Sequence, residues 1–236
     1  MTTVLLIRHG ENEYVKKGRL AGRLPGVHLN EKGRAQAQAL AERLTGAPIK
    51  AIYSSPMERA VETAEPIAKA LNLELSLRPG LIETDYGEWQ DKTLKGLGRL
   101  KLWRVVQVAP SLARFPQGES FAEAQHRICR ELEALCQQHD AKDLIVCVSH
   151  ADPIKLAVAY YLGLPLDNFQ RLGVSPASVS ALHIGEMGSY LMMLNFDPAF
   201  SFQVPEQKAK KTARKERRKA SAALEGQPPE QRQESP

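Results

Sequence analysis

The sequence lacks any apolar run long enough to cross a membrane. Its longest runs, at 144–148 and 154–164, are far shorter than the roughly 18 residues that a spanning helix requires. The beginning of the chain, MTTVLLIRHGE, has no basic segment ahead of an apolar one, and Glu11 follows at once. We therefore expect no signal peptide and no membrane partner, and we expect the protein to stay in the cytoplasm.

Cysteine is scarce, with three residues in a chain of 236. Cys129 and Cys136 lie seven residues apart in a helical pattern. Such a spacing rises by about 10 Å along a helix, whereas the Cα atoms of a disulfide lie closer together. Cys147 lies in an apolar run that is typical of a strand. The three thiols are predicted to be buried and reduced, which is typical of a reducing compartment.

Residues 205–236 have no aromatic side chains, and their most basic stretch has few acids. Between Lys208 and Lys219 there are eight basic residues and one acid, so this stretch carries +7 while the chain as a whole carries +5. The remainder is therefore close to neutral. Without aromatic side chains the stretch cannot stack on bases, and it has no hydrophobic anchor. We favour a solvated tail at 205–236 over a nucleic-acid-binding segment.

The remainder, residues 1–204, has the pattern of one α/β domain. Short β-branched and apolar runs predict strands, and apolar residues at helical spacing predict helices between them. The expected strands are 3–7, 49–53, 73–77, 144–148, 178–184 and 189–195. The expected helices are 30–44, 55–71, a local helix within 94–108, 120–139 and 152–162. Strands that alternate with helices indicate a mostly parallel sheet that is covered on both faces.

Residues typical of helix starts support three of these helices. Asn30 is expected to be an N-cap. Ser55 is expected to cap the next helix, with Pro56 at its first position. Ser120 and Glu123 have the spacing of a capping box. The helices are thus predicted to begin shortly after the turns that follow the strands.

Polar residues that can carry chemistry stand where predicted strands end. Arg8 and His9 follow the first strand, and His150 follows the strand at 144–148. Arg59 lies in the first turn after the second strand, and Glu83 lies in the loop after the third. The carboxyl ends of parallel strands meet at one edge of a sheet, which is where ligands bind in such folds. A lone loop histidine is usually a surface residue, but this five-residue set in this order indicates a site.

The residue types of this set suit a phosphoryl group. Arginine presents a planar fork of donors that matches phosphate oxygens, and a neutral imidazole nitrogen is a competent nucleophile. The arginines and His150 supply positive charge for the transition state, so neither a metal nor another cofactor is required. A carboxyl group such as Glu83 can protonate the leaving oxygen and then deprotonate the attacking water.

The sequence resembles the histidine phosphatase superfamily, also called phosphoglycerate mutase-like, over about residues 3–195. LIRHGENE is similar to the RHG signature of that superfamily. The similarity continues through LNEKGRAQAQALAERL, YSSPMERAVETAEPIA, LIETDYGEWQDKTL, FPQGESFAEAQHRI and VCVSHADPIKLAVAYYLGLP. Within the superfamily the chain resembles most a bacterial branch named for phosphomutases, on the segments PGVHLNEKGRAQA, LWRVVQ and FQRLGVSPASVS.

The resemblance implies a fold and a role for each site residue. The fold would be a three-layer α/β/α sandwich, with residues 78–118 as a partial lid over the site. His9 would be the nucleophile that becomes a phosphohistidine, and Glu83 would be the proton donor and acceptor. The remainder of the phosphate pocket would be Arg8, Arg59 and His150.

Some positions depart from the superfamily pattern RHG-x-T-x-x-N. Asn12 stands at the Thr position and Val15 stands at the Asn position. The side-chain donor to phosphate that Asn would supply is therefore missing at Val15, and Asn12 is the candidate to replace it in part. Ala151 replaces the usual Gly after the second histidine, and Asp91 replaces a common Gly in the lid. These departures bear on the substrate class and leave the five core residues in place.

Further candidates surround the core set. Arg19 and Arg23 lie in the loop after the RHG turn, so we expect them to contact an anionic substrate. Asp85 and Glu88 flank Glu83 and are alternative proton donors.

The predicted function is a cofactor-independent phosphatase that acts on a small phosphomonoester. A phosphomutase is the alternative. Beyond Arg99, Lys101 and Arg104 the lid has no obvious extra cluster of basic residues that would retain a bisphosphate, which favours the phosphatase. A non-catalytic protein that binds a phospho-ligand or nucleic acid is the second alternative. The sequence leaves the oligomeric state open.

Overall fold

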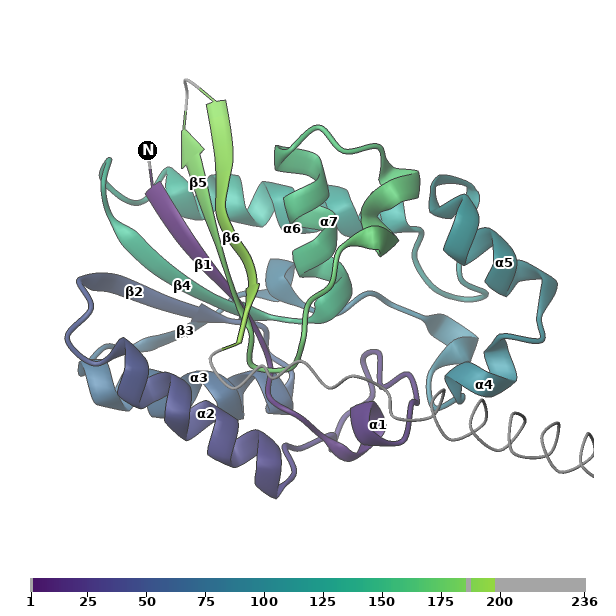
Figure 1. Ribbon diagram of the computed structural model, residues 1–236, viewed down its shortest axis with the longest axis horizontal. Helices are drawn as coiled ribbons and strands as arrows, with labels where there is room; N and C mark the ends of the chain where they lie inside the picture. Colours follow the sequence, from purple (N-terminus) through teal and green to yellow (C-terminus); the bar gives the residue numbers. More distant parts are fainter. Residues whose placement is uncertain (1, 186–187, 198–236) are drawn as a thin grey trace, which may run out of the picture. The chain divides into compact units, whose positions relative to one another are not determined.

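The centre of the fold is a six-stranded sheet within residues 2–185 and 188–197, the part of the chain that the computed structural model describes (Figure 1). The strands are β1 (Thr2–Arg8), β2 (Ile49–Ser54), β3 (Leu75–Leu77), β4 (Leu144–Ser149), β5 (Val179–Gly185) and β6 (Gly188–Phe196). They lie in the order β3-β2-β4-β1-β5-β6. β1 to β4 pair in parallel, whereas β5 pairs antiparallel with both β1 and β6. The prediction of a mostly parallel sheet is therefore confirmed.

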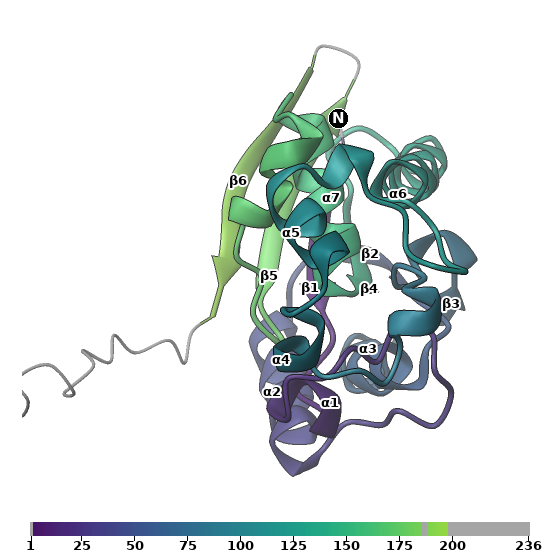
Figure 2. The ribbon, with the colours of Figure 1, turned by 90° about the vertical axis from the view of Figure 1, so that its right-hand side faces the viewer.

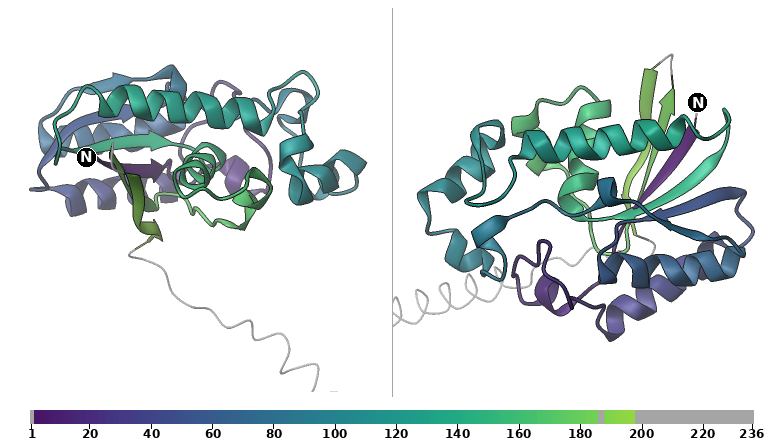
Figure 3. Two further views of the ribbon diagram at one scale, coloured as in Figure 1. Left: turned by 90° about the horizontal axis from the view of Figure 1, so that it is seen from above. Right: turned by 180° about the vertical axis from the view of Figure 1, so that it is seen from behind.

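Helices cover both faces of this sheet and complete the three-layer α/β/α sandwich (Figure 2; Figure 3). One face carries α2 (Glu31–Leu44) and α3 (Glu58–Leu71), and the other carries α6 (Phe121–Cys136) and α7 (Ala151–Tyr161). β1 shows why both faces are covered. Val4 and Leu6 pack with α6 and α7, while Leu5 and Ile7 pack with α2 and α3. A parallel strand that is buried on both faces needs such an unbroken apolar run.

The helix starts agree with the sequence at two of three places. The Asn30 side chain accepts from the Gly33 N–H at 2.8 Å, and Ser120 and Glu123 form the predicted capping box. The prediction for α3 is wrong, because this helix begins at Glu58 rather than near Ser55. Ser55 hydrogen-bonds to His150 at 2.8 Å instead of capping a helix. The Ser55 hydroxyl also accepts from the Met57 N–H at 3.3 Å, one residue before the helix begins.

The predicted local helix at 94–108 is divided into α4 (Leu94–Leu97) and α5 (Lys101–Val108). Gly98 lies at the interruption, and Gly96 lies within α4 just before it. Each glycine costs a helix about 1 kcal/mol relative to alanine, so a continuous helix is not favoured here. The third strand is also shorter than predicted and begins at Leu75.

The lid segment is tied to the loop that follows α1 (Glu13–Lys16). The Asp91 N–H donates to the Leu20 carbonyl at 2.8 Å, and the Leu20 N–H donates to the Lys92 carbonyl at 3.0 Å. The Leu94 N–H donates to the Gly18 carbonyl at 2.8 Å. α1 and α4 accordingly lie close together in both Figure 1 and Figure 2. Short 3₁₀ turns, η1 (Pro79–Leu81), η2 (Gly87–Trp89), η3 (Pro110–Leu112) and η4 (Leu166–Arg171), complete the connections.

The turn after β1 packs against the first turn of α2 through two glycines. A Cβ on Gly10 would lie 2.7 Å from the Gly33 carbonyl oxygen, and a Cβ on Gly33 would overlap the Glu11 carbonyl oxygen. The Gly10 N–H also donates to the Thr63 hydroxyl at 3.0 Å. This close approach of backbones fixes the turn that carries His9.

Three further predictions concern the cysteines, the membrane and the tail. Cys129, Cys136 and Cys147 are free, and Cys136 is only partly buried. No helix within 2–185 and 188–197 is both long and apolar enough to span a membrane. The predicted tail at 205–236 lies outside the described residues.

Candidate active site

A cavity of about 380 Å³ lies where β1 and β4 end. Six of the eight predicted site residues line it, namely Arg8, His9, Asn12, Arg19, Arg59 and Glu83. His150 is fully buried beside them, with its ring centroid 5.2 Å from that of His9. Arg23 does not line the cavity. The fold therefore brings together residues from four separate segments, as the strand-end argument predicted.

The hydrogen bonds of His9 determine which of its ring nitrogens carries a lone pair. Nδ1 lies 2.7 Å from the Gly10 carbonyl oxygen, which can only accept, so Nδ1 carries the proton. Nε2 lies 3.3 Å from Arg59 Nε, which can only donate, so Nε2 holds the lone pair. Burial, reinforced by the positive charges of Arg59 and Arg8, holds the pKa of His9 well below its usual range. The imidazole is thus neutral, and its Nε2 has the lone pair that a nucleophile requires.

Buried donors without a protein partner gather around His9. They are Arg8 Nε, Asn12 Nδ2, Arg59 Nη1 and His150 Nδ1. Other atoms of the same side chains are used to hold them in place: Arg8 Nη1 donates to the Val174 carbonyl at 2.7 Å, and Arg59 Nη2 donates to the Gly22 carbonyl at 2.7 Å. Buried polar atoms in proteins are nearly always hydrogen-bonded. A set of free donors at one cavity therefore fits an oxyanion.

Asn12 has a double role that the sequence only partly indicated. Its Oδ1 caps α1 by accepting from the Val15 N–H at 2.9 Å, and its Nδ2 is one of the free buried donors. The side chain is fully buried and lines the cavity. Asn12 is thus placed to supply a donor that the superfamily pattern would supply from the position of Val15.

Two buried arginines and a buried histidine give the site its electrostatic character. Burial lowers the pKa of both Arg8 and Arg59, and nearby Glu83 opposes that change. The pKa of His150 is lowered well below its usual range by burial and then by Arg59. The two guanidinium groups are thus held in a poorly hydrated place, where a bound dianion is favoured.

Glu83 is protonated far more readily than an ordinary carboxyl group. Burial, followed by the negative charge of Asp152, raises its pKa to about 7, although Arg59 and Arg8 oppose the shift. Its Oε1 accepts from the Thr84 N–H at 2.8 Å, and its Oε2 lies 3.9 Å from His150 Nδ1. A carboxyl group with a pKa near neutrality is suited to both donate and accept a proton.

Asp152 and its partners were not predicted as site residues. Asp152 lines the cavity, accepts from the Tyr86 hydroxyl at 2.8 Å and pairs with Lys155 at 2.8 Å. Burial opposes its ionisation, but Lys155 and Tyr86 lower its pKa overall. The sequence did contain a signal, because Asp152 stands two residues after His150 in the first turn of α7, at the same edge of the sheet.

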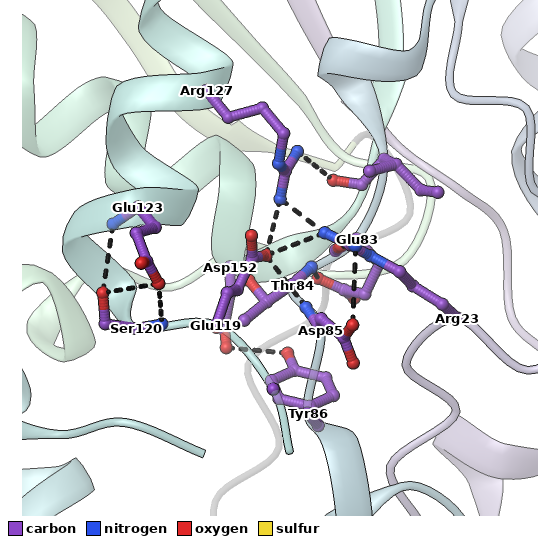
Figure 4. A network of polar contacts seen from close by, with 12 residues as sticks. Arg23, Glu83, Thr84, Asp85, Tyr86, Glu119, Ser120, Glu123, Arg127 and Asp152 are labelled. Atoms are coloured by element: carbon purple, nitrogen blue, oxygen red, sulfur yellow. Dashed lines mark hydrogen bonds and ion pairs between the residues drawn. The ribbon is translucent and has the colours of Figure 1, made fainter. Parts of the chain in front are cut away.

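The backbone of Glu83 is held by two arginines that share one carboxylate (Figure 4). Arg23 Nε donates to the Glu83 carbonyl at 2.8 Å, and Arg127 Nη2 lies 3.4 Å from the same oxygen. Both guanidinium groups also donate to Glu119 Oε1, at 3.0 and 2.7 Å. The Asp85 N–H donates to that same oxygen at 2.9 Å. Arg23 thus holds the backbone of Glu83 and does not line the cavity, contrary to the expectation that it contacts the substrate.

Replacing Glu119 with glutamine is expected to lower kcat on alkyl phosphates roughly tenfold, because small displacements of a catalytic group are costly. Substrates with good leaving groups should be affected much less, since they do not need the proton of Glu83. Glu133→Gln, an exposed acid of α6, is the control. Equal losses on both substrate types would show that Glu119 supports the fold rather than the position of the donor.

The two alternative proton donors are less suitable. Asp85 accepts from the Gly87 N–H at 2.9 Å and faces Arg23 at 3.6 Å, and Glu88 is exposed. Neither lines the cavity. In the described ranges, no group of three or more His, Cys, Asp or Glu side chains is arranged to hold a metal ion.

This geometry is typical of proteins that transfer a phosphoryl group to a histidine. An imidazole lone pair points to the place of the phosphoryl group, and buried cations and an amide lie around it. The chain belongs to the histidine phosphatase superfamily (branch 1), whose family model matches residues 4–197. It is an enzyme of the histidine phosphatase type.

Relatives of known name include both phosphatases and a mutase. The chain is 33% identical over 197 residues to phosphoserine phosphatase 1 of Hydrogenobacter thermophilus, covering 83% of this chain and 92% of that one. It is 30% identical over 193 residues to a 2,3-bisphosphoglycerate-dependent phosphoglycerate mutase of Thermoplasma acidophilum, covering 82% and 92%. The crystal structure of phosphoserine phosphatase from Entamoeba histolytica in complex with 3-phosphoglyceric acid superposes with a TM-score of 0.76 at 28% identity, covering 84% of this chain and 98% of that chain. The predictions of superfamily and fold are confirmed.

Proposed function

We propose that the protein is a metal-independent phosphatase that hydrolyses a small phosphomonoester through a phosphohistidine on His9. The observation that carries this proposal is the tautomer of His9, which places a lone pair on Nε2 among free buried donors. The named relatives that act on phosphoserine support a small phosphorylated metabolite as the substrate.

The proposed reaction has two steps. Arg8, Arg59, Asn12 and His150 bind the phosphoryl oxygens, His9 Nε2 bonds to phosphorus, and the bond from phosphorus to the ester oxygen breaks. Protonated Glu83 gives its proton to the departing alcohol oxygen. A water then bonds to phosphorus while the P–N bond breaks, and the Glu83 carboxylate takes the proton of that water. Phosphate leaves, and both side chains return to their initial states.

A mutase would use the same first step and a second alcohol in place of water. None of the lid residues Arg99, Lys101 and Arg104 lines the cavity, so the lid offers no extra cation to retain a bisphosphate. We therefore favour hydrolysis. The direct test is to follow inorganic phosphate and labelled phosphoester products from the same reaction. Release of phosphate supports the phosphatase, whereas transfer of the label to a second hydroxyl without release supports the mutase.

Treatment with EDTA is expected to leave the activity unchanged, because Arg8 and Arg59 supply the positive charge that a metal would otherwise provide. The measurement is the rate of p-nitrophenyl phosphate hydrolysis before and after chelation and desalting. A large loss that a divalent ion restores would contradict the metal-independent mechanism.

We also propose a cytoplasmic location. The three free cysteines support it, because free thiols are typical of reducing compartments.

A further inference from the structure

Beyond the phosphate-binding residues, the cavity wall is mostly apolar. Val15 of α1 and Leu20 and Ala21 of the loop that follows it line the cavity, and α4 and α5 contribute Leu94, Trp103 and Val106. Phe115 and Phe121 complete the wall. Trp103 packs on Trp89 with ring centroids 5.9 Å apart, and Phe115 lies 5.2 Å from Phe121. This wall is part of a connected aromatic cluster and is not a scatter of single side chains.

The wall has two cations, and each is already paired with a carboxylate. Lys155 lies 2.8 Å from Asp152 and donates to Gln170 at 2.8 Å. Arg19 lies 2.7 Å from Asp91 and also donates to the Asp91 backbone carbonyl. No other Lys or Arg among the described residues lines the cavity apart from Arg8 and Arg59 of the phosphate pocket. The space for the alcohol portion of a substrate therefore offers no unpaired positive charge.

Asp91 adopts a backbone conformation that usually favours glycine. Its φ is +63°, in the left-handed region. A side chain at this position is therefore costly for the backbone, yet it brings a carboxylate to Arg19 at the cavity rim. Arg19 is thus paired with a carboxylate at the place where a substrate would meet it.

Resting on the proposed phosphatase function, we propose that the substrate is a phosphomonoester whose alcohol portion is apolar and uncharged, and that the cavity discriminates against esters that carry a carboxylate. An apolar portion gains free energy by leaving water at the aromatic wall. A carboxylate would lose its hydration there without gaining a free cation, which is unfavourable. Tyr14 and Gln107 still allow a hydroxyl on the substrate.

The experiment compares 2-phenylethyl phosphate with phosphoserine and 3-phosphoglycerate. All three are primary alkyl esters, so differences in rate report binding of the alcohol portion rather than the chemistry of the leaving group. For the wild-type protein, kcat/KM is expected to be about tenfold or more higher for 2-phenylethyl phosphate. p-Nitrophenyl phosphate serves as the general measure of phosphatase activity.

Two variants change the cavity in opposite directions. Trp103→Ala should lower kcat/KM for 2-phenylethyl phosphate by about tenfold through lost apolar contact, with Val108→Ala, an exposed residue of the same helix, as its control. Asp91→Asn should raise kcat/KM for 3-phosphoglycerate about threefold or more by leaving the charge of Arg19 unpaired. Glu88→Gln removes one exposed negative charge nearby without touching Arg19 and is the control for that variant.

The outcomes separate this proposal from the one on which it rests. Preference for the phenylethyl ester together with the gain in Asp91→Asn supports it. Equal or faster turnover of 3-phosphoglycerate or phosphoserine by the wild-type protein overturns the substrate class and leaves the phosphatase intact. Failure of the wild-type protein to hydrolyse any of the esters, p-nitrophenyl phosphate included, overturns both.

Discussion

Replacement of His9 by alanine is expected to abolish turnover, a loss on the order of 10⁴-fold or more, as is found when a catalytic nucleophile is removed. The reason is that the second histidine of the site cannot take its place, because His150 directs Nε2 to Ser55 at 2.8 Å. The measurement is steady-state hydrolysis of p-nitrophenyl phosphate. It is joined by trapping of an acid-labile, ³²P-labelled intermediate, which should be present in the wild-type protein and absent from the variant.

The control for this prediction is His28→Ala. His28 is an exposed histidine that hydrogen-bonds to Glu62 and lies outside the cavity lining. It should retain both activity and the labelled intermediate. Circular dichroism and thermal unfolding should show that His9→Ala remains folded. Substantial hydrolysis by a folded His9→Ala protein would overturn the assignment of the nucleophile, and so would a vanadate-soaked crystal with the oxyanion bound away from His9.

Glu83→Gln is expected to have the second largest effect, and that effect should depend on the leaving group. Alkyl phosphates need a proton on the departing oxygen, so their kcat should fall by about 10²-fold or more. p-Nitrophenol is a much better leaving group, and its ester should be affected less. The measurement is kcat for both substrate types with the wild-type and variant proteins.

The same residue predicts a pH dependence. Because burial and Asp152 raise the pKa of Glu83 to about 7, the carboxyl group is protonated below that pH and loses its proton above it. For alkyl phosphates, kcat/KM of the wild-type protein should therefore fall as the pH rises through about 7. Glu83→Gln should not show this decline, since its amide does not titrate. Glu88→Gln, the exposed acid in the same loop, should keep it.

An equal loss on alkyl and nitrophenyl esters would contradict proton donation by Glu83. If Glu88→Gln alone removed the decline at high pH, the proton donor would be Glu88 and the assignment would be wrong.

The electrostatics of the site favour the binding of an anion. Burial, reinforced by the positive charges of Arg59 and Arg8, lowers the pKa of His9 and of His150 and keeps both rings neutral in the free protein. A phosphoryl dianion adds negative charge among the buried donors, so positive charge at this site is no longer unfavourable. The buried cations thus have two effects: they hold the nucleophile in its neutral form, and they stabilise the charge that develops during transfer.

Several features were predictable from the sequence because they depend on local patterns. The alternation of strands with helices predicted a sheet covered on both faces, as β1 shows, and the Ser120–Glu123 spacing predicted a capping box that the structure contains. The five core residues were predicted because strand ends of a parallel sheet meet at one edge. Identification of the superfamily rested on the same residues in the same order.

Other features depend on contacts between distant segments, and the sequence alone did not determine them. Ser55 was expected to cap α3 but contacts His150, 95 residues away. Arg23 was expected at the substrate but binds the Glu83 backbone and Glu119. The His9 tautomer, the free donor of Asn12 and the raised pKa of Glu83 likewise come from burial and hydrogen-bond partners. Strand and helix patterns are short-range properties of the chain, whereas the direction of a side chain, the identity of its partner and its hydration are set only when the segments pack together.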